Sequence, residues 1–137
     1  MMDKPIDVAL AWQRASNHGD REQLMALSAE DIALVGPRGA TRGRDEVLAW
    51  LDRAGLHLRT LRLFARDGRV VVEQAGRWRD PATGEFGDEQ HLATFFAVAG
   101  GRVIALARRD NLLDALVAGE LRLADEVPLP AAERLAE

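Results

Sequence analysis

Residues 58–79 read LRTLRLFARDGRVVVEQAGRWR, and this stretch decides the fold. Apolar and polar residues alternate along much of it, with the two-residue period of a β-strand. The dipeptide Asp67-Gly68 interrupts the alternation, and Asp-Gly is typical of a tight turn between antiparallel strands. The stretch therefore predicts a hairpin of two long strands, 58–66 and 69–79.

Two further strands extend this hairpin into a meander. After a loop at 80–84, a third strand is expected at 90–98. Gly100-Gly101 predicts another tight turn, which leads into a fourth strand at 102–109. Long twisted strands joined by short turns curl readily, so we expect a curved antiparallel sheet.

Two helices are predicted at the start of the chain. Asp3 and Pro5 suit the first turn of a helix that ends at residues 17–19 (Asn-His-Gly). Asp20 with Gln23 three residues later resembles a capping box, which opens a short second helix.

A third helix precedes the meander. Residues 32–35 form a brief extended run that ends in a turn at 36–39. The helix then begins near Gly43 and stops at Gly55. Its expected buried stripe consists of Val47, Trp50, Leu51 and Ala54.

The order of these elements predicts an α+β fold. A last short helix at 112–118 has Asn111 as its cap and Gly119 as its stop. We expect a cone-shaped curved antiparallel sheet with the three N-terminal helices packed on its concave face. The domain would span residues 1–124, followed by a flexible C-terminal tail at 125–137.

Composition limits the classes of function. The chain has 137 residues, 18 Lys and Arg against 22 Asp and Glu, and no Cys, so thiolate nucleophiles and zinc-thiolate sites are excluded. A net charge of −4 with scattered basic residues argues against nucleic acid as a partner. No apolar run suits a membrane span and no secretory signal is visible, so a cytoplasmic location is expected. No metal-ligand spacing is present, and we expect neither metal nor cofactor.

Several short motifs lie in a characteristic order between about residues 6 and 118. They are Trp12, Gly19-Asp20, Ala29–Leu34, Thr41–Val47, Val70–Glu73, Gly101–Ile104 and Arg109-Asp110. Together they resemble the nuclear transport factor 2-like superfamily, and within it the SnoaL-like group. This resemblance implies a deep, mostly apolar pocket in the cone and a homodimer that pairs through the outer face of the sheet. It does not imply one activity, because relatives include ketosteroid isomerases, limonene epoxide hydrolases, polyketide cyclases, dehydratases and non-catalytic binding proteins.

Strand alternation selects the side chains that face into the cone. The inward set comprises Val70, Val72, Gln74, Gly76, Trp78, Gln90, Leu92, Thr94, Phe96, Ile104, Leu106, Arg108 and Asp110. The expected outward set on the second strand is Val71, Glu73, Ala75, Arg77 and Arg79. The candidate ligand-binding residues are Trp12, Gln74, Trp78, Leu92, Thr94, Phe96 and Leu106.

The resemblance also locates the family's catalytic positions. The general base of ketosteroid isomerases corresponds to Gly36, their buried acid to residues 92–94, and their tyrosine donor to Trp12. The Arg and Asp on the long second strand of limonene epoxide hydrolases correspond to Gln74 and Gly76. At each of these positions the chain lacks the acid or base that the relatives use.

Asp110 is the acidic position that is retained, and it is the candidate catalytic residue. A carboxylate in an apolar cone could act as a general base. Arg108 on the same face could instead keep this carboxylate ionised, or it could bind an acidic group of the ligand. A structural alternative stays open, in which Asp110 caps the last helix or pairs with Arg108 or Arg109. Trp50 is expected to be structural, and His18, His57 and His91 are expected at the surface.

Three functions follow from these observations. The first is binding of a small apolar or aromatic molecule, and it requires a cavity that the protein's own side chains do not fill. The second is a cofactor-free enzyme of the isomerase, polyketide cyclase, hydratase or epoxide hydrolase type, with Asp110 as general base. The third is a non-catalytic protein-interaction module with a vestigial pocket.

Overall fold

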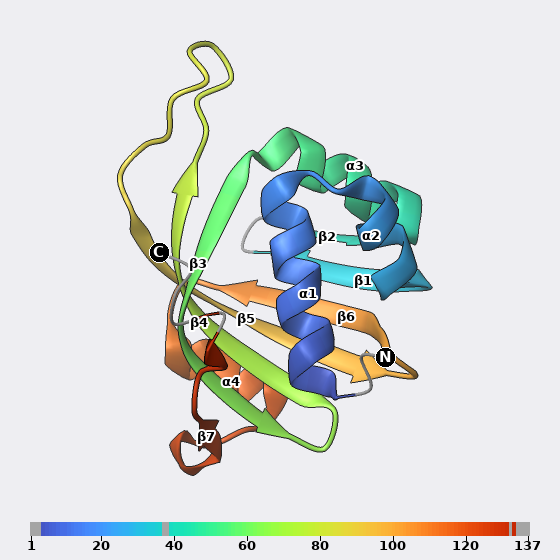
Figure 1. Cartoon of the computed structure of the whole chain (residues 1–137), viewed down its shortest axis with the longest axis vertical. Helices are drawn as coiled ribbons and strands as arrows, with labels where there is room; N and C mark the ends of the chain where they lie inside the picture. Colours follow the sequence, from blue (N-terminus) through green and yellow to red (C-terminus); the bar gives the residue numbers. More distant parts are fainter. Residues whose placement is uncertain (1–3, 37–38, 132, 134–137) are drawn as a thin grey trace.

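A seven-stranded sheet that does not close on itself forms the centre of the molecule (Figure 1). The computed structural model describes residues 4–36, 39–131 and 133. The strand order is β2-β1-β6-β5-β4-β3-β7. The elements, in chain order, are α1 Pro5–His18, α2 Arg21–Leu27, β1 Ser28–Gly36, β2 Gly39–Arg42, α3 Arg44–Ala54, β3 Leu56–Arg66, β4 Arg69–Trp78, β5 Gln90–Ala99, β6 Arg102–Arg109, α4 Leu112–Gly119, the 3-10 turn Leu123–Asp125 and β7 Glu126–Val127.

The predicted hairpins are confirmed. Asp67 and Gly68 both have positive φ, 52° and 81°, as the tight turn between β3 and β4 requires. A Cβ at Gly68 would lie 2.9 Å from the carbonyl oxygen of Val98, so this position also needs glycine for space. The turn between β5 and β6 likewise uses positive φ, 60° at Gly100 and 76° at Gly101.

The sheet is mixed, which corrects the expectation of a purely antiparallel one. β1 runs parallel to β6, with Leu34 beside Leu106, while the other pairs are antiparallel. β1 is longer than predicted, and β2 pairs with it although the sequence predicted no strand there. The parallel pair joins segments that are far apart in the chain, so local periodicity carries no signal for it.

The three N-terminal helices are confirmed, and α1 fills the concave side of the sheet (Figure 1). Trp12 on α1 is 0% exposed and packs edge-on against Phe96 of β5, with ring centroids 5.8 Å apart. The side chain of Asp20 accepts a hydrogen bond from the backbone N–H of Gln23 and caps α2 as predicted. The predicted cap Asp3 lies outside the described residues.

Helix α4 covers part of the convex face of the sheet. Phe64, Val71 and Ala93 point outward and are buried against Leu112 and Leu116 of this helix. The predicted outward direction of Val71 is therefore correct, but its side chain is not exposed. Asn111 caps α4 as predicted, and the left-handed residue that ends the helix is Glu120 (φ 55°) rather than Gly119.

One inward residue was predicted wrongly. Ile104 is 42% exposed, whereas its neighbour Val103 is buried in the inner core. The register of β6 against β5 shifts between Ala97 and Val98, and this irregularity reverses the alternation locally. Beyond it, Leu106 and Arg108 point inward as predicted.

The segment after residue 124 makes defined contacts with the sheet and with α1. β7 pairs with β3, and Arg62 forms an ion pair with Glu126, with 2.8 Å between Nη2 and Oε1. The side chain of Glu133 is buried beside Arg14 at 2.8 Å. The mobility of residues 125–137 stays a prediction.

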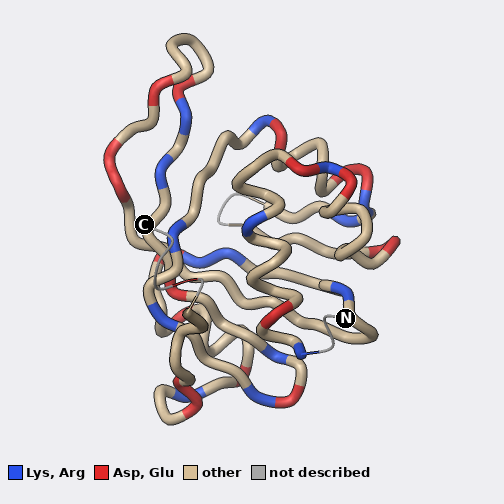
Figure 2. The backbone as a smooth tube through the Cα atoms, viewed as in Figure 1, with Lys and Arg blue, Asp and Glu red and all other residues tan. Residues whose placement is uncertain are grey.

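Charged residues of both signs are interspersed over the described part of the chain (Figure 2). None of the helices in residues 4–36, 39–131 and 133 is long and apolar enough to cross a membrane.

The packing of α4 on the convex face can be tested with two neighbouring residues. Leu116 is 3% exposed and Val117 is 76% exposed. We expect Leu116→Ala to lower the free energy of unfolding by about 2–4 kcal/mol because it leaves a cavity in the outer core. Val117→Ala should change it by less than about 0.5 kcal/mol. Chemical denaturation measures both, and equal effects would contradict this packing.

Candidate functional site

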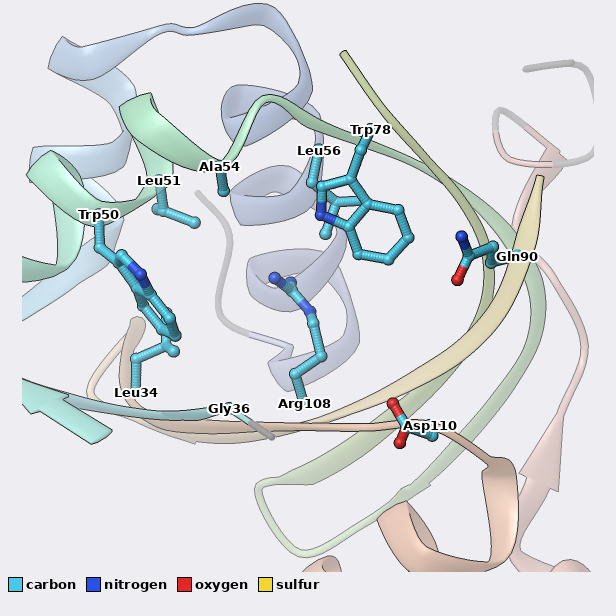
Figure 3. Close-up of a pocket in the computed structure, with 10 residues that line it drawn as sticks. All are labelled: Leu34, Gly36, Trp50, Leu51, Ala54, Leu56, Trp78, Gln90, Arg108 and Asp110. Carbon is cyan, nitrogen blue, oxygen red and sulfur yellow. The ribbon is translucent and has the colours of Figure 1, made fainter. Parts of the chain in front are cut away.

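A cavity of about 600 Å³ opens at one end of the sheet, beneath α3 (Figure 3). It lies between that helix and the ends of β1, β3, β4, β5 and β6. Its lining residues are Leu34, Gly36, Trp50, Leu51, Ala54, Leu56, Trp78, Gln90, Arg108 and Asp110. The volume falls within the range of pockets that hold small organic ligands.

Two tryptophans form the most prominent part of the wall. Trp50 comes from α3 and Trp78 from the end of β4, and Figure 3 shows their rings on opposite sides of the Arg108 side chain. Trp78 was predicted as a ligand-binding residue, whereas Trp50 was expected to be structural. Val47 of the predicted helical stripe is buried in the core, whereas Trp50, Leu51 and Ala54 are only partly buried and also line the cavity.

Gly36 leaves room for the ring of Trp50. A Cβ at residue 36 would lie 2.9 Å from Cη2 of that ring, so a larger residue would displace the indole. This is the position that the resemblance matches to the general base of ketosteroid isomerases. In this chain the wall of the cavity beside Gly36 is the indole ring of Trp50.

Gly76 is enclosed by leucines in a similar way. A Cβ there would lie 2.7 Å from Cδ1 of Leu92 and 3.2 Å from atoms of Leu56 and Leu58. A carboxylate at this position, which the resemblance matches to an acid of limonene epoxide hydrolases, would have no room without displacing these side chains. Gly76 is therefore part of apolar packing between Leu56, Leu58 and Leu92.

Arg108 supplies a positive charge inside the cavity. It lies opposite Thr94 in the β5–β6 pair, and its Nε donates a hydrogen bond of 3.3 Å to Thr94 Oγ1. No carboxylate of the described residues lies within 4.0 Å of its guanidinium nitrogens. Burial lowers the pKa of Arg108 to about 10, so the side chain remains a cation at neutral pH.

A chain of buried hydrogen bonds holds Thr94 in place. Thr94 Oγ1 donates to Gln74 Oε1 (2.8 Å), and Gln74 Nε2 donates to Gln13 Oε1 (2.6 Å). Gln13 Nε2 then donates to Thr60 Oγ1 (2.8 Å). These groups are hydroxyls and amides. The row of hydrogen bonds therefore orients Arg108, and it contains no acid or base that could relay a proton.

Asp110 follows β6 at the edge of the cavity and is exposed. It is not the cap of α4, because Asn111 Oδ1 accepts the hydrogen bond from the backbone N–H of Asp114 (2.9 Å). Within the described residues, its carboxylate has no ion pair with Arg108 or Arg109. The structural alternative for Asp110 is therefore wrong, and its carboxylate is left facing the cavity and solvent (Figure 3).

The other predicted ligand-binding residues lie deeper than the cavity. Trp12, Gln74, Leu92, Thr94, Phe96 and Leu106 are buried in the closed core and do not line the pocket. They do point into the cone, but α1 fills that space, and the indole N–H of Trp12 donates to Ser28 Oγ (2.9 Å). Gln90 was predicted to face inward and does line the cavity, whereas Leu34, Trp50, Leu51, Ala54 and Leu56 were not predicted as pocket residues.

The predicted surface histidines are exposed, and none of them lines the cavity. His91 Nε2 lies 2.6 Å from Glu73 Oε2 on the outer face of the sheet.

Comparison with known proteins gives one family and one fold. The family model of the SnoaL-like domain matches residues 9–106. An NTF2-like protein of unknown function from Cytophaga hutchinsonii is similar in structure, with a TM-score of 0.70, 13% identity and coverage of 81% of this chain and 93% of that one. A putative polyketide cyclase from Sinorhizobium meliloti gives a TM-score of 0.65 at 18% identity, covering 77% and 99%. TerC, co-crystallised with polyporic acid, is similar with a TM-score of 0.66 at 17% identity, and the match covers 80% of this chain and 93% of TerC. No curated protein sequence matches this chain.

The assignment of the α4 cap can be tested with adjacent residues. We expect Asn111→Ala to lower the free energy of unfolding by about 1 kcal/mol, because a backbone N–H of the helix loses its acceptor. Asp110→Asn should change it by less than about 0.5 kcal/mol. Urea denaturation of both variants measures this. A larger loss for Asp110→Asn than for Asn111→Ala would show that Asp110 has a structural role.

Proposed function

The chain belongs to the SnoaL-like domain family, and we propose that it binds a small, flat, apolar or aromatic molecule in the cavity beneath α3. The observation that supports this most directly is the shape of the site. The inner cone is closed by Trp12 and Phe96, while a cavity of about 600 Å³ remains at the open end between Trp50 and Trp78.

The chemistry of the wall supports an aromatic ligand. Leucine side chains and two indoles make up most of the lining, and polar groups come from Gln90, Arg108 and Asp110. A mostly apolar pocket with a few convergent polar groups is typical of small-molecule sites. Stacking or edge contacts with an indole add about 0.5–1.5 kcal/mol to the burial of an aromatic ring. TerC, a protein of the same fold, was crystallised with polyporic acid, and this is consistent with a small-molecule site in such a fold.

The tryptophans provide a direct test with a neutral aromatic probe, 2-naphthamide. We expect Trp50→Ala and Trp78→Ala each to weaken its binding by about tenfold, because each removes one aromatic wall. Phe86→Ala is the control, since Phe86 is an exposed aromatic residue outside the cavity. Isothermal titration calorimetry measures the affinities. Absence of probe binding to the wild type, or equal binding by all variants, would contradict the proposal.

A second candidate function is catalysis, and the position of Asp110 favours it. Its carboxylate lines the cavity without serving as a helix cap, and Arg108 lies on the same strand two residues earlier. Such a carboxylate could remove a proton from a carbon beside a carbonyl group, while the guanidinium stabilises the negative oxygen of the resulting enolate. Returning the proton to a different carbon completes an isomerisation without a cofactor. The open cavity favours both small-molecule functions over a protein-interaction module with a vestigial pocket.

Deuterium exchange tests the catalytic candidate. The probe 2-tetralone is a flat ketone with acidic C–H bonds, and NMR in D₂O follows their exchange. We expect the wild type to accelerate exchange and Asp110→Asn to reduce that acceleration by about 100-fold, because an amide does not accept the proton. Equal exchange rates in the two proteins would exclude Asp110 as the base, and binding of 2-naphthamide confirms that the variant retains its cavity.

The homodimer and the cytoplasmic location stay predictions of the sequence. Part of the convex face is covered by α4. A partner that pairs through the remaining part would meet polar groups such as Glu73 and His91, which contact each other there.

A further inference from the structure

We infer that the cavity selects flat organic acids, and that Arg108 binds the single negatively charged oxygen group of such a ligand. This inference rests on the proposed function and adds the charge of the ligand to it. It depends on how the guanidinium is held, on what surrounds it, and on which other charges face the cavity.

The guanidinium of Arg108 is fixed at one side and open at the other. Its Nε donates to Thr94 Oγ1, and this is its one side-chain hydrogen bond to the described residues. Figure 3 shows the tip of the side chain directed into the cavity between Trp50 and Trp78. The cation–π contacts of the described chain involve other arginines, so Arg108 stacks on neither indole. Both terminal nitrogens are therefore directed at the space that a ligand would fill, in a geometry that suits a carboxylate.

The surroundings make an anionic partner favourable. Most of the lining is apolar and the Arg108 side chain is partly buried, so the cation contacts less water than it would at the open surface. The lowered pKa of Arg108 reflects the same loss of water. A charge-assisted hydrogen bond is stronger in such a medium than in water. An acid that enters the cavity would thus supply the charge partner that the described residues do not.

The other charged groups limit the ligand to one negative charge. Among the described residues that line the cavity, Arg108 is the one cation and Asp110 is the one anion. The neighbouring Arg109 donates to the backbone carbonyl of Arg108 and does not line the cavity. A phosphate group carries more than one negative charge, and here it would find a single arginine and a nearby carboxylate. A carboxylate or an ionised enol carries one negative charge, which one arginine can balance. Asp110 is exposed to solvent, which screens its repulsion of a bound anion.

Two isosteric probes test this inference in the wild-type protein. 2-Naphthoate and 2-naphthamide have the same ring and nearly the same shape, and only the former is charged. We expect 2-naphthoate to bind about tenfold more tightly by isothermal titration calorimetry, since its group accepts charge-assisted hydrogen bonds from Arg108. Arg108→Met and Arg108→Gln should abolish the preference while they retain binding of 2-naphthamide.

Arg102→Met is the matched control, because Arg102 is an exposed arginine at the other end of β6. This variant should keep the preference of the wild type. Equal affinity of the wild type for the two probes, or a preference that persists in the Arg108 variants, would overturn the inference and leave the proposed function intact. Failure of both probes to bind would overturn the proposed function as well. If Arg108→Met does not fold, Arg108→Gln and the wild-type comparison decide the question.

Discussion

A buried chain of hydrogen bonds from Thr60 to Arg108 is the constraint on which the rest of the structure depends. Through Gln13, Gln74 and Thr94 it joins α1 to four adjacent strands, β3 to β6. Polar groups that lose water on burial must find partners, so each of these side chains fixes the position of the next. This row of hydrogen bonds holds α1 in the cone, and it also directs the guanidinium of Arg108 into the cavity. Core packing and site geometry are therefore parts of one arrangement.

This arrangement divides the cone into a filled part and an open part. Trp12 and its neighbours on α1 occupy the interior, and α3 stands over the mouth. Gly36 leaves space for the ring of Trp50, and Gly76 leaves space for leucine side chains. The open part is walled by two tryptophans around one arginine. The apolar wall and the single arginine support the proposal of a flat, anionic ligand.

Local signals predicted much of the fold, and they did so for physical reasons. Asp67-Gly68 and the Asp20 cap act within a few residues, so the sequence shows them directly. The parallel pairing of β1 with β6 joins segments far apart in the chain, and the register shift at Ile104 is an irregularity in how β6 pairs with β5. No period within either segment reveals them.

The candidate site was predicted in part. Arg108, Asp110 and Trp78 line the cavity as predicted, because the two-residue alternation holds along β4 and resumes on β6 beyond the irregularity at Ile104. The same alternation cannot tell how far a helix fills the cone, so buried residues such as Gln74 were placed in the pocket. Trp50 was missed for the converse reason, since a helical apolar stripe is the same whether it faces core or cavity. A crystal structure of the protein with 2-naphthoate would show whether the cavity holds a flat acid. We expect the ring between Trp50 and Trp78 and the carboxylate on Arg108. A cavity closed by its own side chains, or a ligand bound elsewhere, would contradict the proposed site.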